Sequence, residues 1–280
     1  MNPLEALLLG VVQGLTEFLP ISSSGHLILV PWLQDYQYLL DHPHFNKTFD
    51  VALHAGTLVG VLVYFRREIL ELIGGALSVL RRRRVETAPE RLSVNIAVAC
   101  VPAAIVGAAL QDTIDEKLGE PWQIAICLAV FGLALAWADR RAERRDIGSV
   151  GLRDAGIVGV AQAVSLMPGV SRSGITITAA RALGLDRDSA ARFSFLLLAP
   201  ITAGAVLVKG VGVVRDGLPD GAAGPMLIGM AASAVTGYAA IAWMLGYVRR
   251  RSYDVFVGYR LVAAVVVALI ILTDLRPATF

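Results

Sequence analysis

The residue types best suited to chemistry gather in two short glycine-rich stretches of an otherwise apolar chain. Residues 13–26 (QGLTEFLPISSSGH) contain Glu17, and residues 168–174 (PGVSRSG) contain Arg172. Hydroxyls and successive backbone N–H groups beside a glycine can form an anion-binding concavity, and a guanidinium suits bidentate phosphate binding. A helix that begins after each loop adds positive partial charge. The two loops together predict a phosphate or diphosphate site, with phosphate bound by Ser22, Ser24, Gly25, Ser171, Ser173 and Gly174.

Two further groups in the first stretch suit catalysis. Glu17 could bind a divalent cation, Mg²⁺ or Ca²⁺, that bridges carboxylate and phosphate oxygens, or it could orient or deprotonate a nucleophile. His26 suits proton transfer or nucleophilic attack because its ordinary pKa lies close to working pH. Gln13 lies one helical turn before Glu17, and Asp50 and His54 begin the next apolar segment and could line the same cavity.

Most of these residues also have a purely structural interpretation. Serines and glycines also cap helices and let them pack closely. Glu17 and Arg172 could form an ion pair that explains both charges, without excluding a catalytic role. Asp50 and His54 could cap their helix or pair with each other. Two other arginines, Arg181 and Arg260, are expected to snorkel or to pair near helix ends rather than to act at the site.

The two loops align with each other without a gap. At a spacing of 149 residues the identical pairs are Gly10 and Gly159, Val11 and Val160, Gln13 and Gln162, Ser22 and Ser171, Ser24 and Ser173, Gly25 and Gly174, and Ile28 and Ile177. A second, weaker match relates Phe49, Leu53, Ala55 and Gly60 to Phe193, Leu197, Ala199 and Gly204. The sequence therefore predicts internal repeats over about residues 1–138 and 151–273, within one membrane domain of residues 1–280.

Composition indicates a polytopic membrane protein. The 280 residues are 56% hydrophobic and only 17% charged, with a mean hydropathy of +0.64. The apolar residues gather in segments of about 20, the length that spans a bilayer. Six full spans are predicted at 48–65, 91–110, 122–138, 190–209, 224–247 and 254–273. Two more apolar regions, 3–31 and 153–183, are broken by the polar loops and fit re-entrant helix pairs.

Loop charge predicts the orientation. Arginines concentrate in the connections 66–91, 139–153 and 248–253, whereas 32–47, 111–121 and 210–223 hold one basic residue each. The arginine-rich loops are therefore expected in the cytoplasm. One re-entrant pair then opens to the outside and the other to the cytoplasm, an inverted-topology repeat whose loop tips meet inside the membrane. Segment 67–80 is predicted to be an interfacial helix, and Cys100 and Cys127 are expected to form no disulfide.

At these motifs the chain resembles the undecaprenyl-diphosphate phosphatase family, the bacitracin-resistance membrane proteins. Residues 49–57 (FDVALHAGT) and 193–196 (FSFL) share the likeness, which runs through most of the chain. The resemblance implies six spans with two re-entrant pairs in inverted repeat, and a phosphatase that requires a divalent cation. By position, Glu17 would be the second acid of the family's acid-rich motif, and Ser23 and His26 competing nucleophile or proton-transfer residues. Arg172 would grip the phosphates. The first acid of that motif is glutamine here, Gln13, which cannot act as a base.

The resulting hypothesis is an integral-membrane phosphatase that hydrolyses undecaprenyl diphosphate to undecaprenyl phosphate and inorganic phosphate. That reaction would recycle the lipid carrier for peptidoglycan synthesis and confer bacitracin resistance. Ser23, His26 or a water positioned by one of them is the attacking group. The expected partners are a long-chain polyprenyl diphosphate and the bilayer of the bacterial cytoplasmic membrane, with the site open to the outer face. No nucleic-acid partner is expected, and a homodimer is left open. The alternative is a lipid-phosphate transporter that uses the same inverted-repeat site.

Overall fold

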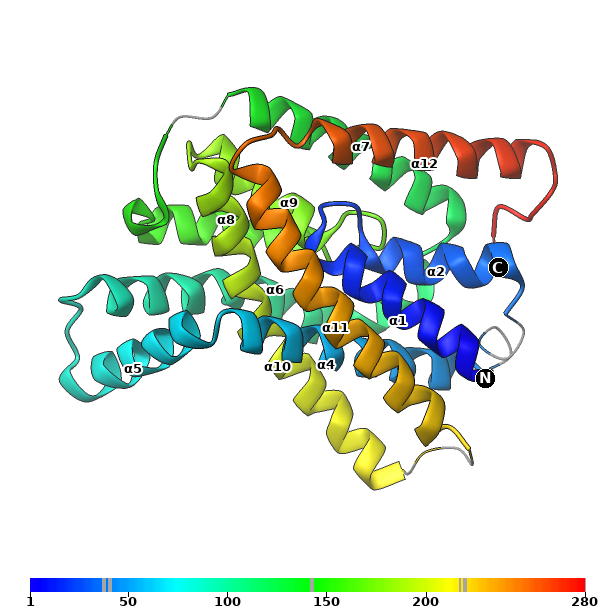
Figure 1. Cartoon of the computed structure of the whole chain (residues 1–280), viewed down its shortest axis with the longest axis horizontal. Helices are drawn as coiled ribbons and strands as arrows, with labels where there is room; N and C mark the ends of the chain where they lie inside the picture. The colour runs from blue at the N-terminus through cyan, green and yellow to red at the C-terminus, as the bar shows by residue number, and fades with distance from the viewer. Residues whose placement is uncertain (37–38, 40–41, 142–143, 217, 219–220, 280) are drawn as a thin grey trace.

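The computed structural model describes residues 1–36, 39, 42–141, 144–216, 218 and 221–279. Within those residues the chain is all-helical, as predicted, and it contains no β-strand (Figure 1). The α-helices are α1 (Pro3–Phe18), α2 (Ser23–Gln34), α4 (Pro43–Tyr64), α5 (Arg66–Arg82), α6 (Ala88–Lys117), α7 (Pro121–Arg140), α8 (Leu152–Val164), α9 (Arg172–Ala182), α10 (Arg187–Asp216), α11 (Ala223–Val248) and α12 (Asp254–Leu272).

Five helices of the described chain are long and apolar enough to cross a membrane, and they match five of the six predicted spans. These stretches are Ala88–Leu110, Pro121–Arg140, Arg187–Val211, Ala223–Val248 and Asp254–Leu272. The sixth prediction, 48–65, falls on α4, which meets the same test only when it is joined to α5. Polar residues near its start, among them Lys47, Asp50 and His54, lower the hydropathy of α4.

Helix α5 turns away from α4 by 89° directly after Tyr64. Its apolar side chains stay largely uncovered, since Leu70 is 68% exposed and Leu80 is 75% exposed. Arg81 and Arg82 lie in its last turn. An exposed apolar face with arginines at the end, at a right angle to the preceding helix, supports the prediction of an interfacial helix.

Both regions that the polar loops interrupt form helical hairpins. Helix α1 ends at Phe18 and α2 begins at Ser23; helix α8 ends at Val164 and α9 begins at Arg172. The breaks therefore fall where Pro20 and the Pro168–Gly169 pair predict them, because a proline cannot continue a helical ladder. In Figure 1 both chain termini lie on the right, opposite the α5–α6 turn on the left. Four consecutive arginines, 81–84, lie at the end of α5 and the start of that turn, so the chain termini lie on the side away from an arginine-rich connection.

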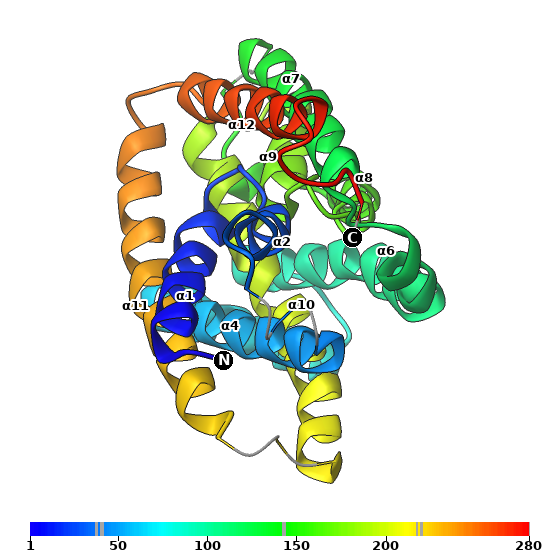
Figure 2. The same cartoon turned by 90° about the vertical axis from the view of Figure 1, so that its right-hand side faces the viewer.

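Helix α1 packs along α11, and α11 in turn packs along α4. Figure 2 shows α1 between α11 and α2. Close approach depends on glycines: a Cβ on Gly10 or on Gly14 would collide with the backbone of α11. Small residues at helix interfaces are the usual way in which membrane helices come close together. This packing fixes the end of α1, and therefore Glu17, deep in the protein.

The main core lies directly beside the end of α1. Phe18 and Phe195 are both fully buried and meet edge to face, with ring centroids 5.4 Å apart, and Phe65 contacts the same Phe195 ring at 6.5 Å. Edge-to-face aromatic pairs are favourable beyond the area that they bury. Cys100 and Cys127 are both free, which confirms that they form no disulfide with each other.

Candidate active site

Glu17 is the centre of the polar cluster that the two loops form. It lies in the last turn of α1 and is 6% exposed. Its Oε1 accepts a hydrogen bond from Arg172 Nη2 at 2.6 Å, and its Oε2 accepts one from Ser23 Oγ, also at 2.6 Å. One carboxylate therefore joins the first residue of α2 to the first residue of α9, and the two loop tips meet as the sequence predicts.

Two more predicted residues face the same carboxylate. Gln13 Nε2 donates to Glu17 Oε2 at 3.1 Å, and His54 Nε2 lies 3.7 Å from that oxygen. His54 Nδ1 lies 2.7 Å from the carbonyl of Asp50. Because a carbonyl only accepts, Nδ1 carries a proton, and in the neutral ring Nε2 then holds a lone pair. His54 is thus oriented to take up a proton beside Glu17.

Arg172 also forms the ion pair that the structural interpretation of the sequence describes. Besides Glu17, it donates from Nη1 to the carbonyl of Ser194 at 3.1 Å, and its side chain is 13% exposed. The guanidinium has five N–H donors, and these two bonds occupy two of them. The remaining donors are available for phosphate oxygens, so the ion pair orients Arg172 without saturating it.

The two loops share the same local geometry. Ser22 and Ser171 have positive φ values of 77° and 75°, which non-glycine residues adopt uncommonly. Each caps its helix: Ser22 Oγ accepts from the N–H of Gly25 at 3.3 Å, and Ser171 Oγ accepts from the N–H of Gly174 at 3.0 Å. Strained backbone that the surrounding structure holds in place is typical of functional sites.

The predicted phosphate-binding serines differ in burial: three are buried and hydrogen-bonded within the loops, whereas Ser24 is half-buried. Ser22 and Ser171 are buried caps, and buried Ser173 donates to the carbonyl of Leu19 at 3.1 Å, across the junction of the loops. Ser24 is only half-buried and contacts Ser22 Oγ at 3.3 Å. Near the helix starts the first N–H groups have no carbonyl within their own helix to bond. The caps use the N–H groups of Gly25 and Gly174, so the N–H groups that precede them, rather than the capping hydroxyls, are the better anion donors.

His26 contacts a different partner from Ser23, which bonds to Glu17. Its Nδ1 lies 2.7 Å from the carbonyl of Ser22, and its Nε2 lies 2.6 Å from the hydroxyl of Tyr259 on α12. The carbonyl fixes the Nδ1 proton, so Nε2 accepts from Tyr259 when the ring is neutral. The structure thus brings Glu17, Ser23, Gln13, His54 and Arg172 together and directs His26 toward α12.

The snorkelling prediction for Arg260 is wrong. Its side chain is fully buried, and all five N–H donors meet backbone carbonyls: Leu128 at 2.9 Å, Cys127 at 3.0 Å, and Pro20, Val170 and Gly169 at 3.1 Å each. Pro20 belongs to the first loop, and Gly169 and Val170 belong to the second. Arg260 therefore ties both loops to α7 from outside the sequence motifs. A charged residue inside the most apolar helix was the available signal.

Arg181, by contrast, pairs near a helix end as predicted. It donates from Nε to Asp139 Oδ1 at 3.0 Å, at the C-terminal end of α7. Arg187 also donates to Asp139, at 2.8 Å to each oxygen.

The donor set around Glu17 fits a divalent cation only when the substrate completes the coordination. Among the described residues no group of three histidine, cysteine, aspartate or glutamate side chains is placed to hold a metal. The protein offers one carboxylate, Glu17, with the imidazole of His54 beside it. Mg²⁺ is commonly bound by one or two carboxylates together with substrate phosphates and waters, so this set suits an ion that arrives with a diphosphate.

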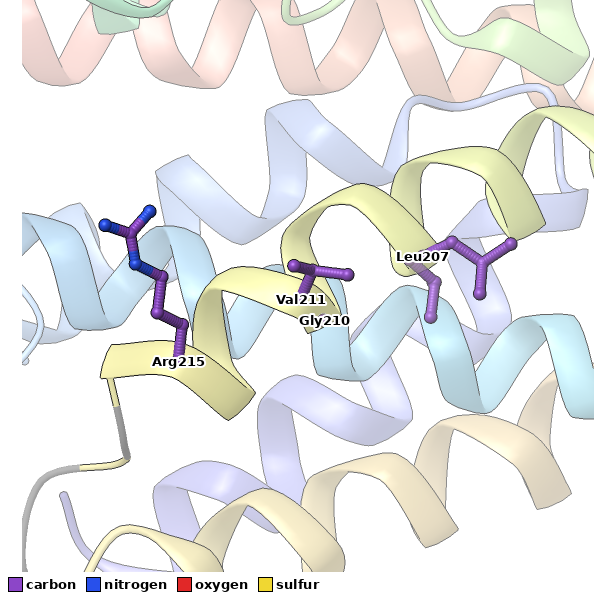
Figure 3. Close-up of a pocket in the computed structure, with 5 residues that line it drawn as sticks. Leu207, Gly210, Val211 and Arg215 are labelled. Atoms are coloured by element: carbon purple, nitrogen blue, oxygen red, sulfur yellow. The ribbon is translucent and has the colours of Figure 1, made fainter.

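A separate hollow of about 470 Å³ lies along the C-terminal half of α10 (Figure 3). Its lining is apolar except for Arg215 at one end, and Leu207 and Val211 are 70% and 67% exposed. None of the predicted site residues lines it, so it belongs to the apolar surface and not to the polar cluster.

The helices and the cluster define a class: an all-helical membrane protein with a buried carboxylate held between a hydroxyl and an arginine from two similar loops. The sequence matches the family described as bacitracin resistance protein BacA over residues 6–266. The chain belongs to this family.

Named relatives cover nearly the whole chain. It is 50% identical over 97% of its length to an undecaprenyl-diphosphatase of Geobacter metallireducens, of which it covers 99%. It is 45% identical over 98% of its length to an undecaprenyl-diphosphatase of Pelobacter propionicus, of which it covers 99%. A third undecaprenyl-diphosphatase, from Geobacter sulfurreducens, is 50% identical over 94% of the chain, and 96% of that relative is covered.

Proposed function

We propose that this protein is an integral-membrane phosphatase that hydrolyses undecaprenyl diphosphate to undecaprenyl phosphate and inorganic phosphate. The observation that carries the proposal is the 2.6 Å hydrogen bond from Ser23 Oγ to Glu17 Oε2 beside Arg172. A hydroxyl bonded to a carboxylate is the arrangement of a nucleophile with its base. The family and the names of its relatives supply the substrate class.

In the proposed reaction Ser23 Oγ attacks the terminal phosphorus and gives its proton to Glu17. The bond from that phosphorus to the bridging oxygen breaks, and the lipid leaves as its monophosphate. Water then hydrolyses the phosphoserine, releases inorganic phosphate and restores the hydroxyl. His54 Nε2, 3.7 Å from Glu17 Oε2, is placed to accept the proton from the carboxyl group.

In the proposed reaction, Arg172 and the N-terminal ends of α2 and α9 neutralise the negative charge of the diphosphate. Arg172 bonds Glu17 where the two loops meet, and α2 and α9 begin at Ser23 and Arg172. The guanidinium and the N–H groups of these helix starts would stabilise the negative charge that develops on phosphorus oxygens there. A divalent cation bound by Glu17 and the diphosphate would add Lewis-acid stabilisation of the same charge. The geometry favours Ser23 over His26 as the nucleophile, because His26 Nε2 faces Tyr259.

The polyprenyl chain is proposed to stay in the bilayer, with the site open to the outer face of the bacterial cytoplasmic membrane. There the product would re-enter peptidoglycan synthesis, and removal of the diphosphate carrier would account for bacitracin resistance. The loop charges support this orientation, because arginines concentrate in the connections 66–91, 139–153 and 248–253, which the positive-inside rule assigns to the cytoplasm.

The test is phosphate release from a polyprenyl diphosphate by the purified protein, with and without a chelator. Ser23→Ala and Glu17→Gln should each lower kcat by about 10³-fold or more, as loss of a nucleophile or its base does. Ser149→Ala is the control, since its hydroxyl donates to the carbonyl of Asp146 outside the cluster, and it should retain most of the rate. Wild-type release by folded Ser23→Ala would exclude the serine as nucleophile.

The transporter alternative predicts that the activity requires a different set of residues. Carrying a lipid phosphate across the membrane needs Arg172 and the loop N–H groups but no base beside a hydroxyl. Glu17→Gln protein that releases no phosphate yet moves polyprenyl phosphate between the leaflets of a vesicle would support transport. Loss of both activities would assign Glu17 to a shared binding step.

A further inference from the structure

A charged cavity lies at the arginine-rich ends of α7 and α11, outside the cluster around Glu17. Its volume is about 680 Å³, and five arginines line it against three aspartates, a formal excess of two positive charges. The arginines are Arg140, Arg144, Arg181, Arg187 and Arg249. Nothing in the proposed phosphatase reaction uses them.

The floor of this cavity is a closed ion-pair network. Asp139 accepts from Arg181 Nε at 3.0 Å and from Arg187 Nε and Nη2 at 2.8 Å each, and it also accepts from the backbone N–H of Tyr253 at 3.2 Å. Four hydrogen bonds fill the lone pairs of one carboxylate. Asp139 therefore holds the floor in place and has no remaining capacity to neutralise the rim.

The other two aspartates are also engaged. Asp188 accepts from Arg192 Nε and from Arg249 Nε, both at 2.9 Å. Asp186 Oδ1 accepts from the backbone N–H of Ser189 at 2.7 Å, as a cap of α10. The acids therefore act as structural partners within the lining.

The rim, in contrast, keeps unused donors. The side chains of Arg140 and Arg144 are exposed and make no hydrogen bond or ion pair with any residue that the structure describes. Arg249 uses only its Nε, and Arg187 leaves its Nη1 unbonded within the same described residues. Four guanidinium groups thus surround the cavity with free N–H donors, the chemistry that recognises phosphate.

Aromatic residues place this rim at the depth of lipid headgroups. Trp137 lies one turn before Arg140 on α7 and is 51% exposed. On α11, Trp243 is 52% exposed and stacks on Tyr247 with ring centroids 5.1 Å apart. Tryptophan and tyrosine concentrate where a membrane helix leaves the hydrocarbon, and basic pockets between helices there bind anionic headgroups.

We propose that this cavity binds the phosphate group of an anionic membrane lipid, on the side of the protein away from the chain termini. The lipid's phosphate would meet Arg140, Arg144 and Arg249, while Asp139 with Arg181 and Arg187 forms a fixed floor. This site is independent of the phosphatase proposal and holds whether or not Ser23 is the nucleophile.

The experiment is a native mass spectrometry titration of the full-length protein with phosphatidylglycerol against phosphatidylcholine. Arg140→Gln/Arg144→Gln removes two unbonded rim guanidiniums without breaking a described ion pair. Arg81→Gln/Arg84→Gln is the matched control, because it makes the same charge change in the exposed α5–α6 turn, away from the cavity.

Wild type and control should bind phosphatidylglycerol in preference to phosphatidylcholine, and the rim variant should bind it about ten- to thirtyfold more weakly, at roughly a three- to fivefold loss for each arginine. Equal weakening in control and rim variant would reduce the effect to general surface charge and overturn the proposal. Displacement of the lipid by inorganic phosphate alone at equal concentration would show a phosphate site that does not require a lipid, which also overturns it. Competition by polyprenyl phosphate would identify the product lipid as an occupant of the same site.

Discussion

Arg260 is the residue for which the structure makes the sharpest prediction, because one side chain holds both loops of the site. We expect Arg260→Lys to weaken folding and to slow catalysis although the positive charge is kept. Lysine has three donors where arginine has five, so at least two of the five carbonyls lose their partner.

The magnitude follows from burial. The arginine is fully buried, so a carbonyl that loses its donor has no water to replace it. Each buried unsatisfied group costs about 1–3 kcal/mol, so the variant should lose about 2–6 kcal/mol of stability. The carbonyls of Pro20 and Val170 lie just before the loop serines. A displacement of about 1 Å at this point would cost on the order of 10²-fold in kcat.

The assay combines thermal unfolding in detergent with phosphate release by the folded fraction isolated by size exclusion. Arg192→Lys is the matched control: Arg192 is 25% exposed and pairs with Asp188 and Glu68, contacts that a lysine can keep. The control should behave as wild type. An Arg260→Lys protein with an unchanged unfolding midpoint and wild-type kcat would refute the reasoning, because the carbonyl contacts would then position nothing.

Three further expectations concern other parts of the structure. His54→Gln should lower kcat by about 10²-fold or more because Nε2 faces Glu17, whereas His26→Gln should keep most of the rate; the reverse order in steady-state kinetics would make His26 the catalytic histidine. Asp139→Asn should destabilise the protein by about 3–5 kcal/mol in thermal unfolding, because it leaves buried Arg181 without its charge partner; Asp188→Asn, at a 27% exposed site, should cost less. Burial raises the pKa of Asp154 and its hydrogen bond from Arg145 lowers it, and the balance lies below the ordinary value. A lowered carboxyl pKa stabilises the fold above the unfolded-state pKa and ceases to do so as the pH falls through the folded-state pKa. Asp154→Asn should therefore flatten the acid limb of a plot of unfolding midpoint against pH, and an unchanged limb would contradict this.

Much of the fold could be predicted because its signals are local. Apolar segments of bilayer length give the spans, and Pro20 and the Pro168–Gly169 pair give the breaks in the two hairpins. The contact between Glu17 and Arg172 was also foreseeable, since two opposite charges at membrane depth each need a partner. The sixth predicted span, 48–65, meets the hydropathy test only when α4 is joined to α5, because the polar start of α4 weakens its hydropathy signal.

The remaining details of the site depend on the directions in which side chains point, and no local sequence pattern determines those directions. Sequence reasoning ranks His26 above His54 because His26 follows the serine loop. The structure turns His26 toward Tyr259 and brings His54 from another helix to Glu17. Which face of a helix meets a loop depends on how α4 and α12 pack, and this packing involves residues far from the motifs. For the same reason Arg260 could be noted as unusual but not assigned to the loops.

The match between the two loops explains why one site needs both halves of the chain. At the spacing of 149 residues Ser23 aligns with Arg172, and each is the first residue of its helix. Both donate to Glu17, one to each carboxylate oxygen at 2.6 Å. The position that aligns with Glu17 in the second half is Leu166, so only one half supplies the acid. Two loops of the same shape thus bring a hydroxyl and a guanidinium to opposite oxygens of one carboxylate. The similarity of the loops provides the geometry, and the chemistry comes from aligned positions at which they differ, above all 17 against 166 and 23 against 172.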